Sequence, residues 1–452
     1  MDDILPGGGK ALAPLEGPRR RFAIGCVLLA MTLVVLDASV ANVALPTIGR
    51  TLHVSAADSV LVVTAYQAAL IMALLPCAAL GESLGYRRIF MTGVAIFVSA
   101  SLLCAASPSL PWLVAARFVQ GLGGAAVMAL GVALLRHAVS QEQLPKVIGW
   151  NALTVALASA AGPTVGAAIL SVANWQWLFA LNLPLGGLVF LAGYNLPRNA
   201  ATGKPVDLIS IAINGAGFAM LIWGAELLSN DPVRGLSLLA ASGLAFTLLL
   251  KRELPRAMPF VPLDLLRSAS FRFSMAASIC CFAGQAAGMI ALPFYLQHGL
   301  GLSTWMTGLY ITPWPLAVAL TAPVSSYLAE RCSTSRLCAI GGTIMATGLA
   351  AAALWPLAGS PLPLVPILMV CGIGFGLFQV PNNHNMFLSV PRERSGAAGG
   401  MQGTARLIGQ SSGAIVMALL FSANTSSAPR IGLGFGAGMV LLAALISARR
   451  AS

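Results

Sequence analysis

Charged side chains are scarce in this 452-residue chain: only 9% of the residues are Asp, Glu, Lys or Arg, against 58% that are hydrophobic. The mean hydropathy is +0.85. A soluble domain keeps a charged surface around its core, so this composition excludes a soluble globular protein and indicates a chain buried in lipid. No segment is long and polar enough to form a separate soluble domain.

Motifs of the common enzyme classes are also missing. The chain has four His residues and contains no HExxH pair, no Asp-rich diphosphate motif and no Ser, His and Asp arrangement in its apolar segments. Glycine runs such as Gly121–Gly124 lie inside apolar segments with no strand before them, so they are not dinucleotide loops. Gly9-Lys10-Ala11 lacks the Ser or Thr of a phosphate-binding loop. We expect neither an enzyme nor an ATP-driven protein, and neither a cofactor nor a metal.

Cysteine pairs that could form a disulfide framework or a zinc site are absent. None of the eight Cys residues belongs to a CxxC pair, and none falls in a loop expected outside the membrane. The net charge of +12 does not indicate nucleic-acid binding, because the basic residues are spread over short loops.

What the chain does contain is long apolar stretches. A helix needs roughly 20 mostly apolar residues to cross a bilayer, and fourteen such stretches lie at 22–45, 56–80, 89–106, 111–135, 147–170, 177–194, 207–227, 233–250, 271–296, 304–328, 335–357, 361–380, 397–421 and 430–448. They predict an all-α integral membrane protein.

The stretches divide into two similar blocks of six. We predict a tail at 1–21, a six-helix bundle at 22–196, an inserted helix pair at 207–250, a charged linker at 251–268 and a second six-helix bundle at 271–448. Two similar halves around a central cavity are the usual build of secondary transporters, with the substrate site near mid-membrane. Two such halves are better suited to a transporter whose halves rock against each other than to a channel.

The positions of Lys and Arg predict the orientation. Of the 26 basic residues, 21 fall in alternate gaps on one side, three fall on the other side (Arg50, Arg234 and Arg430), and Arg117 and Arg406 lie within stretches. Basic residues concentrate in cytoplasmic loops, so both termini are expected in the cytoplasm. The first apolar stretch is too long for a cleavable signal and carries Asp37, so we interpret it as a retained span.

Ionisable residues inside the membrane are costly and mark candidate functional sites. Asp37 lies about 22 Å into the first span from the inside, and Arg117 about 9 Å into the fourth from the outside, which places them at a similar depth in a core of about 30 Å. A changing distance between the two could load and release a proton. The alternative is a static salt bridge that holds the two spans together.

The remaining ionisable residues have simpler interpretations. Arg406 lies near mid-membrane with no acid at matching depth in its half; it faces water or substrate, or else is satisfied by carbonyls and Gln410. Glu226 is expected to extend toward the outer surface, and Asp207 to cap a helix. Polar and aromatic residues within spans are substrate-cavity candidates, although amides in helices also bond neighbouring helices; with Arg406 they are Tyr66, Gln67, Gln120, Gln285, Tyr295, Gln297, Trp314, Gln379 and Asn382.

Several motifs resemble those of one family. LDASVANVALP at 36–46 resembles the first-span motif of the fourteen-span drug:proton antiporters of the major facilitator superfamily, and RFVQGLGGAA at 117–126 its fourth-span motif. AGPTVG at 161–166 is similar to the antiporter motif, WQWLFALNLPLG at 175–186 to the signature entering span 6, and residues 391–414 to the loop and span 13 that carry the arginine here numbered Arg406. The resemblance covers nearly the whole chain.

The resemblance implies roles for particular residues. It links Arg117 and Gln120 to proton transfer, the role already inferred for Asp37 from its depth, and it implies that Gly162, Pro163 and Gly166 seal the outer mouth. Ala158, Gly162 and Gly166 recur every fourth residue and form a small face that lets another helix approach, while Pro163 should bend the span.

The gating loop after span 2 departs from the family pattern. The acid, the last Gly and the basic pair remain as Glu82, Gly85, Arg87 and Arg88, but Ala78 and Ser83 replace other motif positions.

We therefore expect a proton-coupled exporter of lipophilic cationic or neutral drugs, working by alternating access as a monomer in the bacterial inner membrane. The cationic class is limited to monovalent compounds, because only Asp37 is a convincing deep carboxylate. Its partners would be a small-molecule substrate, protons and the bilayer, and its energy source the proton gradient. The alternative is a transporter of a specific metabolite, siderophore or amino acid with the same fold.

Overall fold

The computed structural model describes residues 16–140, 142–197, 207–227, 231–253, 263–356, 360–390, 395–423 and 427–450, and every regular element in these ranges is helical. The first half contains α1 (Gly17–Thr51), α2 (Ala56–Leu84), α3 (Tyr86–Ala105), α4 (Leu110–Ala138), α5 (Leu144–Val172), α6 (Gln176–Ala180) and α7 (Asn182–Gly193). α6 and α7 together form the sixth predicted span. The predicted tail overlaps α1, which begins at Gly17, and residues 1–15 lie outside the described ranges.

The second half begins with a short η1 (Leu263–Arg267) and continues through α10 (Ala269–Phe294), η2 (Tyr295–Gly299), α11 (Thr304–Ile311), α12 (Pro313–Arg331), α13 (Thr334–Leu354), α14 (Leu364–Leu388), α15 (Ser395–Ala423) and α16 (Ala428–Arg449). η2 extends α10 as a π-helix. Half of the predicted linker, residues 254–262, lies outside the described ranges.

Thirteen helical segments of the described residues are long and apolar enough to cross a bilayer. The tenth predicted stretch is not among these segments; it is divided into α11 and α12 at Thr312 and Pro313. Proline has no N–H to continue the helical hydrogen bonds. The chain is thus an all-helical membrane protein, while the count of fourteen spans and the orientation of the termini stay predictions.

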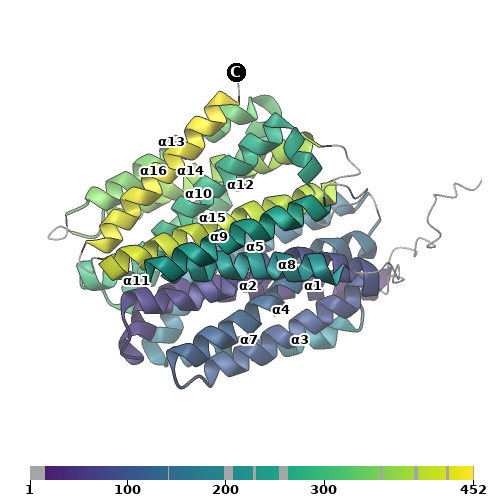
Figure 1. Cartoon of the computed structure of the whole chain (residues 1–452), viewed down its shortest axis with the longest axis horizontal. Helices are drawn as coiled ribbons and strands as arrows, with labels where there is room; N and C mark the ends of the chain where they lie inside the picture. The colour runs from purple at the N-terminus through teal and green to yellow at the C-terminus, as the bar shows by residue number, and fades with distance from the viewer. Residues whose placement is uncertain are drawn as a thin grey trace, which may run out of the picture.

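Two groups of helices face each other across the centre of the molecule. Figure 1 shows the purple-to-blue helices of the first half on one side and the green-to-yellow helices of the second half on the other. Between them α2 packs against α15, α5 packs against α11 and α12, and α1 packs against α10. The second helix of each half therefore meets the fifth helix of the other, as expected for two similar halves related by a pseudo-twofold axis.

The inserted pair, α8 (Leu208–Leu227) and α9 (Pro232–Glu253), forms a hairpin whose α8 packs against α2 and α15. Asn214 donates a hydrogen bond to the Met72 carbonyl of α2 (3.1 Å). The carboxylate of Asp207 accepts from the backbone N–H groups of Ile209 and Ser210, which confirms the predicted helix cap. Arg252 also pairs with Asp207 at 3.3 Å and closes the base of the hairpin.

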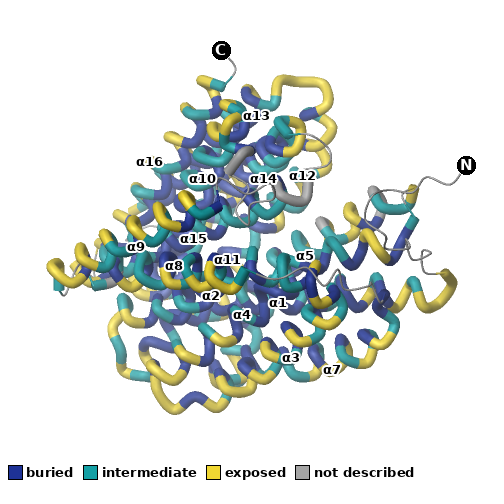
Figure 2. Tube along the Cα trace, turned by 45° about the vertical axis from the view of Figure 1, so that its right-hand side comes forward, coloured by how far each residue is buried: buried dark blue, intermediate teal, exposed yellow. Residues whose placement is uncertain are grey.

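Buried residues concentrate where helices face one another, and exposed ones lie on the outward faces and at the loops (Figure 2). Small residues set the helix separations. A Cβ added at Gly121 of α4 would lie 2.4 Å from the Tyr66 carbonyl oxygen of α2, and one at Gly123 would lie 2.5 Å from the Phe97 nitrogen of α3. Glycine is needed here because the backbones touch, which agrees with a packing role for this glycine run.

The predicted outer ends of the two halves are joined directly. Arg50 at the end of α1 donates to Gln297 Oε1 in η2 at 3.2 Å. The hydroxyls of Thr164 in α5 and Thr312 between α11 and α12 are hydrogen-bonded at 2.5 Å. A Cβ added at Gly308 of α11 would meet the Pro163 carbonyl at 2.6 Å. The structure is therefore closed across this end.

The close approach of α2 and α4 generates a stability prediction. Gly121→Ala would push a methyl group into the Tyr66 carbonyl and the Ala69 side chain, so we expect the free energy of unfolding to fall by about 1–3 kcal/mol, the usual cost of overpacking. Thermal unfolding of detergent-purified protein measures it.

Gly187→Ala in α7 is the matched control, because a Cβ there meets nothing within 4 Å. Exchanging Gly for Ala in a helix interior is favourable by roughly 1 kcal/mol when space allows, so the control should be neutral or stabilising. Equal effects of the two substitutions would contradict the role of Gly121 in helix packing.

Candidate functional site

Asp37 of α1 and Arg117 of α4 form a buried ion pair. Arg117 Nη1 donates to Asp37 Oδ2 at 2.5 Å, and both side chains are 1% exposed. Burying an unpaired charge in a low-dielectric interior is very costly, whereas a pair with further hydrogen bonds is tolerated. The structure thus brings together two residues 80 positions apart that the depth estimate had placed in one layer.

The second carboxylate oxygen of Asp37 is held by two amides. Oδ1 accepts from Gln120 Nε2 of α4 at 2.9 Å and from Asn182 Nδ2 of α7 at 2.6 Å. Both amide nitrogens also donate to Ser101 Oγ of α3, at 2.8 and 3.2 Å. Ser101 in turn donates to the Phe97 carbonyl. Four helices therefore share one hydrogen-bond network around a single carboxylate.

Arg117 makes four further contacts that hold its guanidinium in place. Its Nε donates to the Val62 carbonyl of α2 at 3.2 Å, and its Nη1 donates to Gln120 Oε1 at 2.6 Å. The guanidinium carbon lies 4.2 Å from the centre of the Tyr66 ring and 5.4 Å from that of Phe179, which allows cation–π attraction. The carbonyl and the rings remain available to Arg117 if Asp37 loses its charge.

A cavity of about 410 Å³ lies next to this ion pair, between the two halves. Arg117 lines it, whereas Asp37 does not. Of the predicted cavity residues it includes Tyr66, Gln67, Gln285, Trp314, Gln379 and Arg406. Helices α1, α2, α4 and α5 contribute from one half, and α10, α11, α12, α14 and α15 from the other. The volume is in the range of pockets that bind drug-sized molecules.

Several polar atoms at the cavity wall have no hydrogen-bond partner. They are Tyr66 Oη, Trp314 Nε1, Arg406 Nε, Gln67 Oε1 and Asn42 Oδ1. The Arg406 side chain reaches from α15 toward α4, where its Nη2 lies 3.9 Å from the sulfur of Met128. Buried polar groups normally find partners, so these atoms are where water or a ligand would bind.

Four of the predicted cavity residues do not line this cavity: Gln120, which bonds Asp37, and Tyr295, Gln297 and Asn382. The Tyr295 hydroxyl donates to the Trp355 carbonyl at 2.9 Å, Gln297 accepts from Arg50, and Asn382 donates to the Ser274 carbonyl and Ser278 hydroxyl. The last three bond neighbouring helices instead, which is the common alternative role of polar residues in membrane helices.

The small face of α5 is the place where α5 crosses two other helices. A Cβ on Gly162 would meet Ser39 Oγ at 2.2 Å, and one on Gly166 would meet Val40 at 3.3 Å, so both glycines face α1. The Pro163 carbonyl faces Gly308 of α11 on the other side. Gly162 and Gly166 thus pack within the first half, and Pro163 lies at the contact between the two halves near the predicted outer end.

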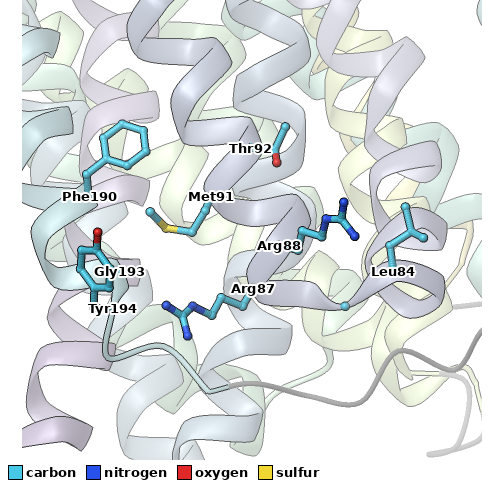
Figure 3. A pocket seen from close by; sticks show the side chains of 9 residues that line it. Leu84, Arg87, Arg88, Met91, Thr92, Phe190, Gly193 and Tyr194 are labelled. Carbon is cyan, nitrogen blue, oxygen red and sulfur yellow. The ribbon is translucent and has the colours of Figure 1, made fainter.

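The loop between α2 and α3 depends on Gly85, whose φ of 102° favours glycine. Beside it a groove of about 690 Å³ runs between α3 and α7, lined by Leu84, Gly85, Arg87, Arg88, Met91, Thr92, Phe190, Gly193 and Tyr194. Figure 3 shows the Arg87 and Arg88 side chains pointing to opposite sides of α3. Glu82 is exposed at the end of α2.

Sequence reasoning missed Asn182 and Ser101 as site residues. Asn182 stands inside the quoted motif at 175–186, and as an amide inside an apolar span it could have been singled out. Ser101 gave no such signal, because a serine in a helix often bonds its own backbone. The side chain of Glu226 lies outside the described residues. Within the described part of the chain no three His, Cys, Asp or Glu side chains group to hold a metal.

Comparisons with known proteins agree with this architecture. The profile of the Major Facilitator Superfamily matches residues 27–414. The chain is 42% identical over 440 residues, covering 96% of each protein, to the uncharacterized transporter YebQ of Escherichia coli (strain K12).

Two further relatives have named roles. One is the riboflavin transporter RibZ of Clostridioides difficile (strain 630), 29% identical over 82% of this chain and 81% of that protein. The other is the tetracenomycin C resistance and export protein of Streptomyces glaucescens, 29% identical over 92% of this chain and 78% of that protein.

The network around Asp37 generates a prediction for Asn182. Asn182→Ala removes a hydrogen bond to a buried charge, so the free energy of unfolding should fall by about 1.5–3 kcal/mol. In an Asp37→Asn background the loss should be smaller, because the bond then joins two neutral groups. Thermal unfolding of the four proteins of this double-mutant cycle measures the difference.

Asn195→Ala serves as a control, because Asn195 bonds only the nearby Ala192 carbonyl among the contacts seen. It should have little effect in either background. If Asn182→Ala lowers the free energy of unfolding equally in the normal protein and in the Asp37→Asn variant, Asn182 acts independently of the carboxylate.

Proposed function

Because this chain belongs to the Major Facilitator Superfamily, whose profile matches residues 27–414, we propose that it is a proton-coupled exporter of amphipathic organic compounds that works by alternating access. The observation that carries the proposal is the buried carboxylate of Asp37, paired with Arg117 beside a central cavity. The membrane transporter class follows from the family; proton coupling and export direction are the proposal.

Asp37 is the proposed proton carrier. Protonation would remove its charge and leave Arg117 buried without a counterion, a loss of about 3–5 kcal/mol for a broken buried pair. That free energy would favour an arrangement in which Arg117 keeps its hydrogen bond to the Val62 carbonyl of α2 and turns its Nη1 toward the solvent of the cavity. Because Asp37 and Arg117 lie on different helices, a proton would shift the packing of α1 against α2 and α4.

The two halves supply the moving parts. Their contacts at the predicted outer end, Arg50 with Gln297 and Thr164 with Thr312, are hydrogen bonds that can exchange with water. In our proposal this closed end corresponds to the state that receives substrate from the cytoplasm. Opening it would break these contacts and separate Gly308 from Pro163. In the closed state the contact of Pro163 with Gly308 would prevent leakage through the outer mouth.

The names of two relatives point to two different types of substrate. One relative is named for resistance to and export of tetracenomycin C, which favours drug efflux, and another is named for riboflavin, which favours a defined metabolite. The volume of the cavity does not distinguish between these two types of substrate. A compound panel that includes both kinds is therefore needed.

Proton movement in energised inside-out vesicles tests the proposal. The panel comprises ethidium, riboflavin and neutral and anionic aromatic compounds. A transported compound should release protons from the lumen, seen as a rise in lumenal pH, with the normal protein. Asp37→Asn should abolish this response, because an amide neither takes up nor releases a proton near neutral pH.

Asp58→Asn is the matched control, since Asp58 is exposed at the start of α2 and bonds only Ser55 among the contacts seen. It should respond like the normal protein. Proton release that persists undiminished in Asp37→Asn would leave the ion pair with a purely structural role.

A further inference from the structure

The charges at the wall of the central cavity are unbalanced. Among the described residues that line it, Arg117 and Arg406 are the cations, and none is Asp, Glu, Lys or His. Arg117 is neutralised by Asp37, which lies behind it. Arg406 has no acidic partner among the salt bridges of the described residues. The cavity therefore carries about one net positive charge, contrary to what a cationic substrate would require.

The hydrogen-bond donors at the cavity wall that lack a partner also favour an anionic ligand. Trp314 Nε1 and Arg406 Nε can only donate hydrogen bonds, and both lack an acceptor. Trp314 is fully buried and Tyr66 is 2% exposed, so their polar atoms are held in place by packing. The three groups come from α2, α12 and α15, and therefore from both halves. An oxygen-rich anionic group would satisfy them, whereas an ammonium group would not.

The remaining residues of the cavity wall favour binding of an aromatic group of a substrate. Tyr66, Phe282, Trp314 and Phe375 line the cavity, and Phe282 and Phe375 pack edge to face at 5.4 Å between ring centres. Aromatic side chains bind flat apolar groups through offset or edge-to-face contacts. The amides of Gln67, Gln285 and Gln379 add neutral polar positions. Recognition of one anionic head and one aromatic body is thus possible in the same cavity.

We infer that the central cavity binds aromatic monoanions, such as sulfonates or carboxylates, through Arg406 assisted by Trp314 and Tyr66. This inference deepens the proposed function and rests on it for the assumption that the cavity carries the substrate. It replaces the expectation of lipophilic cations, which depended on Asp37 facing the substrate. A neutral aromatic compound would bind through the same walls without the contribution of Arg406.

The charge of the substrate also determines how it interacts with the proton. A cation would compete with a proton on Asp37, but an anion would be favoured when Asp37 is neutral, because Arg117 is then uncompensated. Since protonation of Asp37 would strengthen anion binding, exchange requires that the protein change conformation only with one of the two bound, so that the proton enters and the anion leaves in separate halves of the cycle. Each cycle would move more than one charge, so the membrane potential would drive export strongly, by about 2.3 kcal/mol per charge at 100 mV.

Binding of three compounds that share one ring system tests the inference. Naphthalene-2-sulfonate is anionic, naphthalene-2-sulfonamide is its neutral isostere, and 2-naphthyltrimethylammonium is cationic. Equilibrium dialysis against detergent-purified protein, with empty micelles as blank, gives the affinities. We expect the sulfonate to bind most tightly and the ammonium compound most weakly.

The Arg406→Gln variant should lose roughly ten-fold or more in sulfonate affinity, as expected for hydrogen bonds to a charged group. Its sulfonamide affinity should change by less than about two-fold, which also shows that the variant is folded. Arg234→Gln is the matched control, because the Arg234 side chain is 80% exposed on α9. It should bind all three compounds like the normal protein.

Asp37→Asn separates this inference from the proposed function. If both are right, the variant loses proton release but binds the sulfonate at least as tightly as the normal protein. Normal proton release by Asp37→Asn together with the expected charge preference would overturn the proposed coupling alone. Tighter binding of the ammonium compound, unchanged sulfonate affinity in Arg406→Gln, or no binding of any of the three would overturn the inferred substrate class.

Discussion

The ion pair between Asp37 and Arg117 is the interaction on which the first half of the molecule is organised. A carboxylate this deep in an apolar helix is tolerable only when it is paired with a cation and further hydrogen-bonded. Its partners come from α4 and α7, and Ser101 of α3 fixes the two amides that complete the set. The Val62 carbonyl of α2 holds the arginine from the opposite side. One charge thus determines how five helices are placed.

The structure is suited to switching between two arrangements because the contacts within each half differ from those between the halves. The helix contacts formed by glycine are close and rigid, as at Gly121 against Tyr66 and Gly162 against Ser39. The hydrogen bonds that join the halves at the predicted outer end are few and can exchange with water. Each half can therefore move as a unit, while a change of charge at Asp37 alters the packing inside the first half.

The two halves are similar in build but different in charge. The first half contains the ion pair, whereas the second contributes Arg406 and the neutral residues Gln285, Trp314 and Gln379 to the cavity. This separation keeps the proposed proton site behind the cavity wall and leaves a cationic wall for the substrate. A cationic substrate would be stabilised by a carboxylate at the cavity wall, and Asp37 is not among the described residues that line it.

Hydrophobic runs and the positions of charges were enough to predict the helical membrane architecture, because a bilayer demands long apolar helices whatever their packing. Depth counting from the helix ends also placed Asp37 near Arg117. The break at Thr312 and Pro313 was less visible, since proline can bend a helix or end it. The sequence could not show that Asn182 and Ser101 complete the ion pair, that Tyr295, Gln297 and Asn382 bond neighbouring helices, or that Arg406 faces the cavity. A polar side chain in an apolar helix needs a partner, but which partner it meets depends on helix rotation and separation, and only the tertiary packing decides these.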